Sequence, residues 1–128
     1  MNTSEVASKF VTMCNQGKNF DVMKELYAGN IVSVEAVRRK TGSFETAGKA
    51  EVIQKSVEWA AAHEIHGGKV DGPFLLGDQF AVVFEFDVTV KATGERIQDR
   101  EIAVYTVADS LITREEFFYG EGAKALAR

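Results

Sequence analysis

The strongest constraint on the fold is a change of hydrophobic period in the middle of the chain. From residue 69 to Tyr119 apolar and polar side chains tend to alternate, most strictly from Phe84 to Lys91. Such alternation places apolar side chains on one face of a β-strand and polar ones on the other. Before Gly67-Gly68 the apolar residues instead recur at helical spacing. The chain therefore predicts helices first, followed by a sheet with one face on a core.

These patterns divide the 128 residues into the elements of one domain. Asn2 and Glu5 have the spacing of a capping pair at the start of the first helix. Short turn signals separate the later strands, which favours an antiparallel meander. We expect helices at about residues 3–17, 20–28 and 49–63, and strands at about residues 31–37, 68–76, 79–91, 95–107 and 111–119. No role is assigned to the final segment, 121–128.

Composition and charge argue against several classes of partner. The net charge is −4, and acids and bases are mixed along the chain without a basic stripe, so we expect no binding to nucleic acid. No apolar run is long enough to span a bilayer, and the first ten residues do not resemble a signal peptide. We therefore expect a cytoplasmic protein without membrane association. The single Cys14 lies in an apolar helical pattern, which predicts a buried thiol rather than a nucleophile.

The order of the helical and strand patterns resembles that of a known family. The resemblance is carried by the pattern Phe10-Val11-x-x-x-Asn15-x-Gly17, the segment LYAGNIVSVEA, the helix-opening Gly48-Lys49 and the last strand from Leu111 to Tyr119. In this order they resemble the SnoaL-like branch of the nuclear-transport-factor-2-like superfamily over nearly the whole chain. The resemblance implies an α+β fold in which three N-terminal helices pack into a strongly curved, mostly antiparallel sheet, forming a cone with an apolar cavity. Members include isomerases, polyketide cyclases, epoxide hydrolases, dehydratases and non-catalytic modules, so the fold does not fix the function.

Alignment with the ketosteroid isomerases of that superfamily implies that their catalytic groups are missing. Those enzymes use a general-base Asp and an oxyanion hole formed by a Tyr and a protonated Asp. The base position falls on Ala36, the Tyr position on Phe10 and the protonated Asp position on Ala103. Because none of these three side chains can donate or accept a proton, we do not expect steroid-type isomerisation by that mechanism.

Two carboxylates remain as candidates for chemistry in the implied cavity. If the family's acid position faces the cavity, the period of two turns Glu101 and Tyr105 to the same face, and Glu115 faces inward from the last strand. An acid on an apolar wall is suited to general acid or base catalysis. The alternative is that both carboxylates lie at a solvated rim or pair with arginines on neighbouring strands.

The stretch from Glu58 to Gly68 holds the only Trp and both His residues of the chain. On a continuing helix Trp59, His63 and His66 form one stripe, which the resemblance places at the cavity mouth. Trp59 would then be a stacking wall, and either His a hydrogen-bonding or proton-transferring group. The two His are three residues apart without an evident third ligand, so no metal is expected. The alternative is structural, with His63 bonded to a carbonyl at the helix end.

Two classes of function therefore stay open. Both are classes of a small-molecule pocket protein of the SnoaL-like type, and the first is a cofactor-independent acid–base enzyme of cyclase, isomerase or dehydratase type, acting on a small apolar or amphipathic molecule. The catalytic candidates are Glu101, Glu115, Tyr105 and His63. The ligand-binding candidates are Trp59, His66, Phe10, Phe84, Phe86, Ala36, Ala103, Phe117 and Tyr119. The alternative is a non-catalytic binding or assembly module with the same fold, and in either case we expect a homodimer formed through the sheet.

Overall fold

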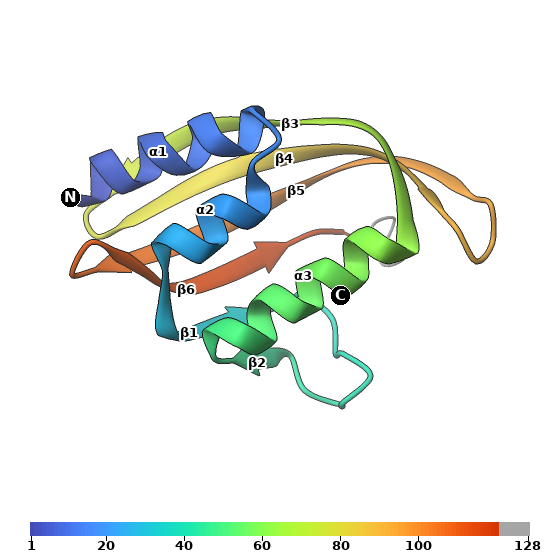
Figure 1. Ribbon diagram of the computed structural model, residues 1–128, viewed down its shortest axis with the longest axis horizontal. Coiled ribbons are helices and arrows are strands. Elements are labelled where there is room, and N and C mark those ends of the chain that lie inside the picture. The colour runs from blue at the N-terminus through green and yellow to red at the C-terminus, as the bar shows by residue number, and fades with distance from the viewer. Residues whose placement is uncertain (121–128) are drawn as a thin grey trace.

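Three helices cover one face of a six-stranded sheet in the computed structural model, which describes residues 1–120 (Figure 1). The segment 121–128, to which the sequence assigns no role, lies outside the described residues. The helices are α1 (Thr3–Asn15), α2 (Asn19–Leu26) and α3 (Lys49–Ala62). The strands are β1 (Tyr27–Val34), β2 (Glu45–Ala47), β3 (His63–Leu76), β4 (Gln79–Val90), β5 (Arg96–Ala108) and β6 (Leu111–Phe118). The expected α+β fold is confirmed, and its sheet is curved but unclosed.

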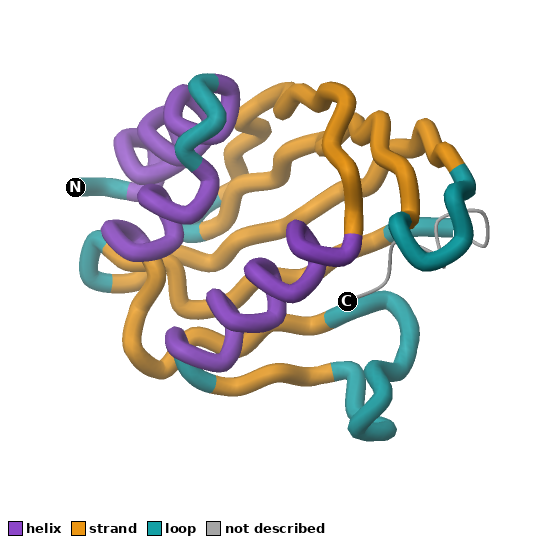
Figure 2. The backbone as a smooth tube through the Cα atoms, turned by 45° about the vertical axis from the view of Figure 1, so that its right-hand side comes forward, coloured by secondary structure: helices purple, strands orange, loops and turns teal. Residues whose placement is uncertain are grey.

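The strands follow the order β2-β1-β6-β5-β4-β3 across the sheet. The four C-terminal strands form the antiparallel meander that the short turns predict, and the sheet bends around the helices (Figure 2). The exception is β1, which pairs in parallel with β6 and sets Ser33 opposite Glu115. This pairing brings the first strand and the last strand together, next to the short edge strand β2.

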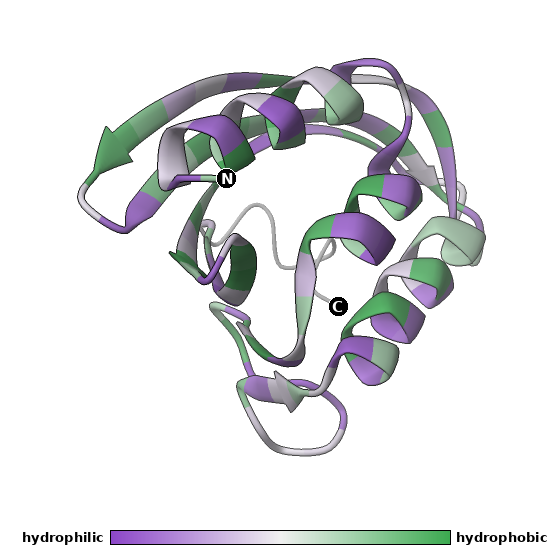
Figure 3. Ribbon diagram, turned by 60° about the vertical axis from the view of Figure 1, so that its left-hand side comes forward, coloured by the Kyte–Doolittle hydropathy of each residue, from purple (hydrophilic) through white to green (hydrophobic). Residues whose placement is uncertain are grey.

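Alternation along β4 and β5 builds the core on the concave face. Phe80 pairs with Tyr105 and Phe84 pairs with Glu101, so these four side chains point to the same side of the sheet. Phe10 of α1 packs against this surface, with its ring centroid 4.6 Å from that of Tyr105. Colouring by hydropathy shows apolar and polar residues interspersed along the helices and the strands (Figure 3). Burial of each large apolar side chain stabilises the fold by about 1.5–3 kcal/mol.

The predicted capping pair at the start of α1 is confirmed. The Glu5 N–H donates to Asn2 Oδ1 at 2.9 Å, and the Asn2 N–H donates to Glu5 Oε1 at 3.0 Å. These two bonds satisfy backbone donors that the first helical turn leaves without partners. The cap therefore fixes where α1 begins.

The boundary between α3 and β3 differs from the expectation. The helix ends at Ala62, and His63 already has extended backbone angles and pairs with Val90 of β4. The long strand β4 offers backbone partners to residues 63–65, and this pairing stops the helix before Gly67. His66 therefore lies on a strand, and the expected helical stripe does not reach it.

Two smaller differences concern β1 and β2. The second helix ends at Leu26 rather than at residue 28, because Tyr27 pairs with Ile112 of β6 and starts β1. The strand β2 has three residues, which is too short a run to show alternation, and it pairs with β1 at the edge of the sheet. Within residues 1–120, no helix combines the length and the apolar character needed to cross a membrane.

Candidate functional site

A cavity of about 500 Å³ lies between the helices and the concave face of the sheet. Most of its wall is aromatic or aliphatic. The aromatic part of the lining includes Phe10, Trp59, Phe84, Phe86, Tyr105 and Phe117. Tyr27 and Glu115 contribute polar groups to the same wall. The volume and the mostly apolar lining are those of a site for a small molecule.

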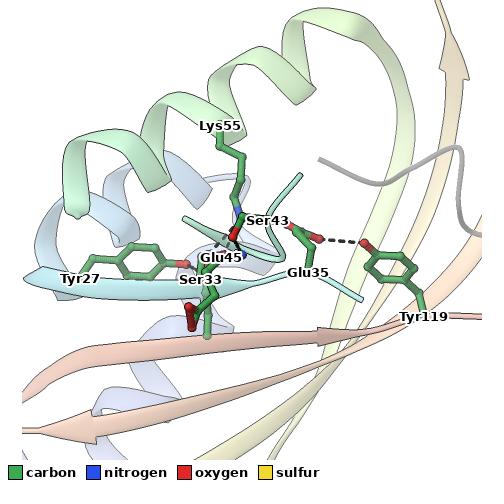
Figure 4. Close-up of polar contacts among 8 residues, drawn as sticks. Tyr27, Ser33, Glu35, Ser43, Glu45, Lys55 and Tyr119 are labelled. Carbon is green, nitrogen blue, oxygen red and sulfur yellow. Dashed lines mark hydrogen bonds and ion pairs between the residues drawn. The ribbon is translucent and has the colours of Figure 1, made fainter. Parts of the chain in front are cut away.

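A cluster of buried charged side chains stands beside this cavity (Figure 4). Lys55 on α3 points toward the sheet, and its Nζ lies 2.8 Å from Glu35 Oε1 and 4.0 Å from Glu115 Oε1. Nζ also donates to the hydroxyl of Ser33 on β1. The side chains of Lys55 and Glu35 are 1% and 0% exposed. The Lys55 ammonium group thus links α3 to two carboxylates: Glu115 on β6, and Glu35 just after the end of the neighbouring strand β1.

Each carboxylate of the cluster also accepts a hydrogen bond from a tyrosine. The Tyr119 hydroxyl donates to Glu35 Oε2 at 3.0 Å, and the Tyr27 hydroxyl donates to Glu115 Oε2. Burial, followed by the negative charge of Glu115, raises the pKa of Tyr27 well above its usual range. Tyr27 therefore stays a neutral phenol and remains a hydrogen-bond donor to Glu115.

The cluster is divided between the cavity wall and the layer behind it. Tyr27 and Glu115 line the cavity, whereas Lys55 and Glu35 do not. Glu115 is thus the carboxylate through which the cluster reaches the cavity wall. It can accept a proton from a molecule in the cavity or return one, while Lys55 and Tyr27 hold it in place.

Cys14 lines the same cavity from α1. Burial raises the pKa of its thiol to about 12. The side chain is therefore a neutral thiol near neutral pH and lacks the thiolate form that a nucleophile requires. Cys14 contributes apolar surface to the wall.

The family of the chain follows from its sequence as a whole. A family model described as the SnoaL-like domain matches residues 1–119. The chain belongs to the SnoaL-like domain family. A proposed SnoaL-like polyketide cyclase from Mesorhizobium loti, also described as a carbohydrate phosphatase, is 43% identical, with a TM-score of 0.88 over 93% of this chain and 100% of that chain. No curated protein matches this sequence.

More distant structures share the fold of this SnoaL-like domain. A proposed isomerase from Bacillus subtilis is 19% identical, with a TM-score of 0.74 over 94% of this chain and 90% of that chain. A nuclear-transport-factor-2-like protein from Burkholderia thailandensis is 16% identical, with a TM-score of 0.77 over 92% of this chain and 90% of that chain. The resemblance inferred from the sequence motifs is confirmed.

The two carboxylates singled out in the sequence of this SnoaL-like domain are both buried. Glu101 is 2% exposed and Glu115 is 1% exposed. Glu115 and Tyr105 line the cavity, whereas Glu101 is buried on the same face of the sheet without lining it. Arg100 points away from them and pairs with Glu85 at 3.3 Å. The solvated-rim alternative therefore does not describe either carboxylate.

Five of the nine predicted ligand-binding residues are part of the cavity lining. Phe10, Trp59, Phe84, Phe86 and Phe117 line the cavity of the SnoaL-like domain. Ala103 and Tyr119 do not line the cavity: Ala103 is buried in the core, and the Tyr119 hydroxyl donates to Glu35.

Ala36 differs from its expected position. It is exposed after the end of β1, and the preceding residue, Glu35, is the buried one. Ile31 and Ser33 on β1 and Glu35 directly after it are the buried residues of this alternation, so an alignment shifted by one residue exchanges the buried position for the exposed one. An acid thus lies at the inner end of β1, although the alignment implies that none is present.

The two histidines of the SnoaL-like domain lie outside the cavity lining. His63 Nδ1 is 2.7 Å from the Trp59 carbonyl oxygen, and the two rings stack with centroids 4.4 Å apart. His63 thus has the contact with a helix-end carbonyl that the structural alternative describes. His66 is exposed, and its Nε2 lies 2.7 Å from Thr89 Oγ1 because β3 has already begun. Within residues 1–120, no three His, Cys, Asp or Glu side chains are grouped to hold a metal ion.

Sequence reasoning missed Lys55 and Glu35 as members of the site. Lys55 follows the buried Val52 by three residues and precedes Trp59 by four, so it occupies the inward face of α3. A lysine within an apolar helical stripe is the signal that could have pointed to a buried cation. Its partners come from β1 and β6, which only the fold brings together.

Proposed function

We propose that this SnoaL-like domain is a cytoplasmic, cofactor-independent enzyme that performs acid–base chemistry on a small apolar or amphipathic molecule. The reaction class is a cyclisation, an isomerisation or a dehydration. The observation that carries the proposal is Glu115, a carboxylate on the wall of a mostly apolar cavity, with Tyr27 and Lys55 fixed beside it. Such a group is positioned to move a proton on a substrate that water cannot freely reach.

In the proposed step Glu115 acts as the base. Its carboxylate takes a proton from a carbon next to a substrate carbonyl, so that a C–H bond breaks and an O–H bond forms on Glu115. The electron pair moves into the carbonyl system, and the proton is then returned to another atom of the same substrate. Tyr27 positions Glu115 by donating to Oε2, and Lys55 compensates part of the negative charge. The aromatic wall orients the apolar body of the substrate.

The test is proton exchange into a ketone that fits an apolar cavity. A bicyclic ketone such as decalone is incubated with the protein in D2O, and deuterium incorporation beside the carbonyl is followed by NMR. We expect Glu115→Gln to slow the protein-dependent exchange by about 10²-fold or more. Glu116→Gln is the matched control, because Glu116 pairs with Arg114 and does not line the cavity. Equal exchange rates for the wild type and Glu115→Gln would remove Glu115 from the mechanism.

A non-catalytic binding module is the second candidate. The observation in its favour is that Glu35 and Lys55 do not line the cavity, and their ion pair with each other accounts for the burial of both. In that case the wild type binds the ketone but produces no exchange above the buffer rate. The same NMR experiment therefore separates a catalyst from a binder.

We further propose that two copies associate through the convex face of the sheet. Ile102 and Phe118 are cross-strand neighbours on β5 and β6, and they are 46% and 52% exposed. Arg100 and Glu85 form an ion pair beside them, and an interface of this kind would have an apolar centre and a polar rim. A second copy would cover the exposed apolar side chains while the ion pairs stay near solvent.

A further inference from the structure

We propose that the ligand of this cavity carries a cationic amine on an apolar body, with the amine placed beside the Glu115 carboxylate. The inference rests on the proposed function, because it uses the same cavity and the same carboxylate. It adds the charge class of the molecule, which neither the fold nor the family specifies.

The first argument is the place of Glu115 in the buried cluster. Glu35, Glu115 and Lys55 are each at most 3% exposed. Glu115 is the acid of this cluster that lines the cavity, whereas Lys55 and Glu35 do not line it. The hydroxyls of Tyr27 and Tyr119 donate hydrogen bonds to the carboxylates but bring no positive charge. An ammonium group that enters the cavity would therefore meet an acidic side chain away from bulk water, where a charge-assisted hydrogen bond is strong.

The second argument is the geometry around Glu115. Its Oε2 accepts the hydrogen bond from Tyr27, whereas its Oε1 lies 4.0 Å from Lys55 Nζ, at the outer limit of an ion pair. Lys55 is closer to Glu35, at 2.8 Å. The ammonium is thus engaged mainly with Glu35, and Glu115 keeps an oxygen for a donor that arrives through the cavity.

The third argument is the lining itself. Trp59, Phe84 and Phe86 present aromatic rings to the cavity, and aromatic faces attract cations. Among the described residues, Lys69 is the only basic residue of the lining. Its side chain is 59% exposed and lies 3.4 Å from Glu85. An anionic ligand would therefore meet Glu115 without a buried cation to receive it, whereas an amine would meet a carboxylate and aromatic rings.

The experiment compares three compact probes that share one apolar body: adamantylmethylamine, adamantylmethanol and adamantanecarboxylate. Trp59 is the only tryptophan of the chain and lines the cavity, so its fluorescence reports binding. Calorimetry gives an independent Kd for each probe. We expect the amine to bind on the order of tenfold more tightly than the alcohol, and the carboxylate to bind most weakly.

Variants locate the preference. Glu115→Gln should bring the amine and the alcohol to similar affinities, whereas Glu115→Asp and the exposed-side control Glu116→Gln should keep the amine ahead. If Glu115→Gln does not fold, the ratio of the wild-type Kd values for the amine and the alcohol decides the charge preference. Equal binding of amine and alcohol, or a preference that survives in a folded Glu115→Gln, overturns this inference and leaves the proposed pocket function standing. Failure of all three probes to bind overturns both.

Discussion

Lys55 Nζ and Glu35 Oε1 form an ion pair of 2.8 Å in which both side chains are almost fully removed from solvent. One partner comes from α3 and the other follows the end of β1. The pair therefore ties the helix that covers the cavity to the strand that borders it. A charge at this depth is tolerated because the opposite charge and further hydrogen bonds accompany it.

The first prediction concerns the cost of breaking this pair. Lys55→Met removes the ammonium and leaves Glu35 buried without its cation, so the free energy of unfolding should fall by about 3–5 kcal/mol. Urea unfolding followed by circular dichroism measures the loss. Lys9→Met is the control, since the Lys9–Glu25 pair is half exposed and should contribute at most about 1 kcal/mol. Equal losses for the two variants would contradict the structural role of Lys55.

The second prediction compares the two tyrosine hydroxyls. Tyr27→Phe removes the donor to Glu115 from a fully buried site and should lower the free energy of unfolding by about 1–3 kcal/mol. Tyr119→Phe removes the corresponding donor to Glu35, but Tyr119 is only partly buried, so water can replace its hydroxyl and the loss should be smaller. Urea denaturation of both variants at one pH gives the order. A larger loss in Tyr119→Phe would contradict the inference that the Tyr27–Glu115 hydrogen bond is the more deeply buried of the two.

The third prediction follows from the raised pKa of Cys14. The thiol ionises near pH 9.0 in the unfolded chain but only near pH 12 in the folded protein, because burial opposes the thiolate. The unfolded state therefore releases a proton first as the pH rises, and stability falls between these two values. At pH 10 the loss from this group is about 1.4 kcal/mol relative to pH 7.

Cys14→Ala isolates that contribution. The variant loses the thiol, so its free energy of unfolding should decline less between pH 7 and pH 10 than that of the wild type. Unfolding curves at the two pH values for both proteins measure the difference. Parallel declines in the two proteins would show that the thiol ionises equally in the folded and unfolded states.

The sequence predicts the frame of this fold well because its signals are local. The alternation from Phe84 to Lys91 and the short turns after β3, β4 and β5 are sufficient for the meander and for the shared inner face of Glu101 and Tyr105. The capping pair at Asn2 and Glu5 sets the start of α1. Each of these features depends on residues close together in the chain.

The start of β3 and the buried cluster could not be predicted in the same way. His63 becomes extended because β4 supplies a backbone partner, which local spacing does not show. A lysine on a helix ordinarily reaches solvent, so Lys55 reads as a surface residue until β1 and β6 place Glu35 and Glu115 opposite it. The position of Ala36 was missed by one residue, and on a strand one residue exchanges the two faces.

The fourth prediction tests association through the convex face. Ile102→Glu places a charge at the centre of the exposed apolar pair with Phe118, so it should shift a dimer toward the monomer. Val57→Glu is the control, because Val57 is similarly exposed but lies on α3. Analytical ultracentrifugation over a range of concentrations measures the equilibrium. A wild type that sediments as a monomer at all concentrations would refute the proposed interface.

Two hydrogen bonds at the cavity wall and beside it join residues that are far apart in the chain. Tyr27 and Glu115 are separated by 88 residues, and Glu35 and Tyr119 by 84. A chain emerging from the ribosome therefore contains its helices and its first strand long before it contains β6, the strand that carries Glu115. Before β6 is synthesised, Lys55 has only one of its two carboxylate partners, and Glu115, the residue proposed for catalysis, is not yet present. The residue on which the proposed function depends is thus among the last of the described residues to be synthesised.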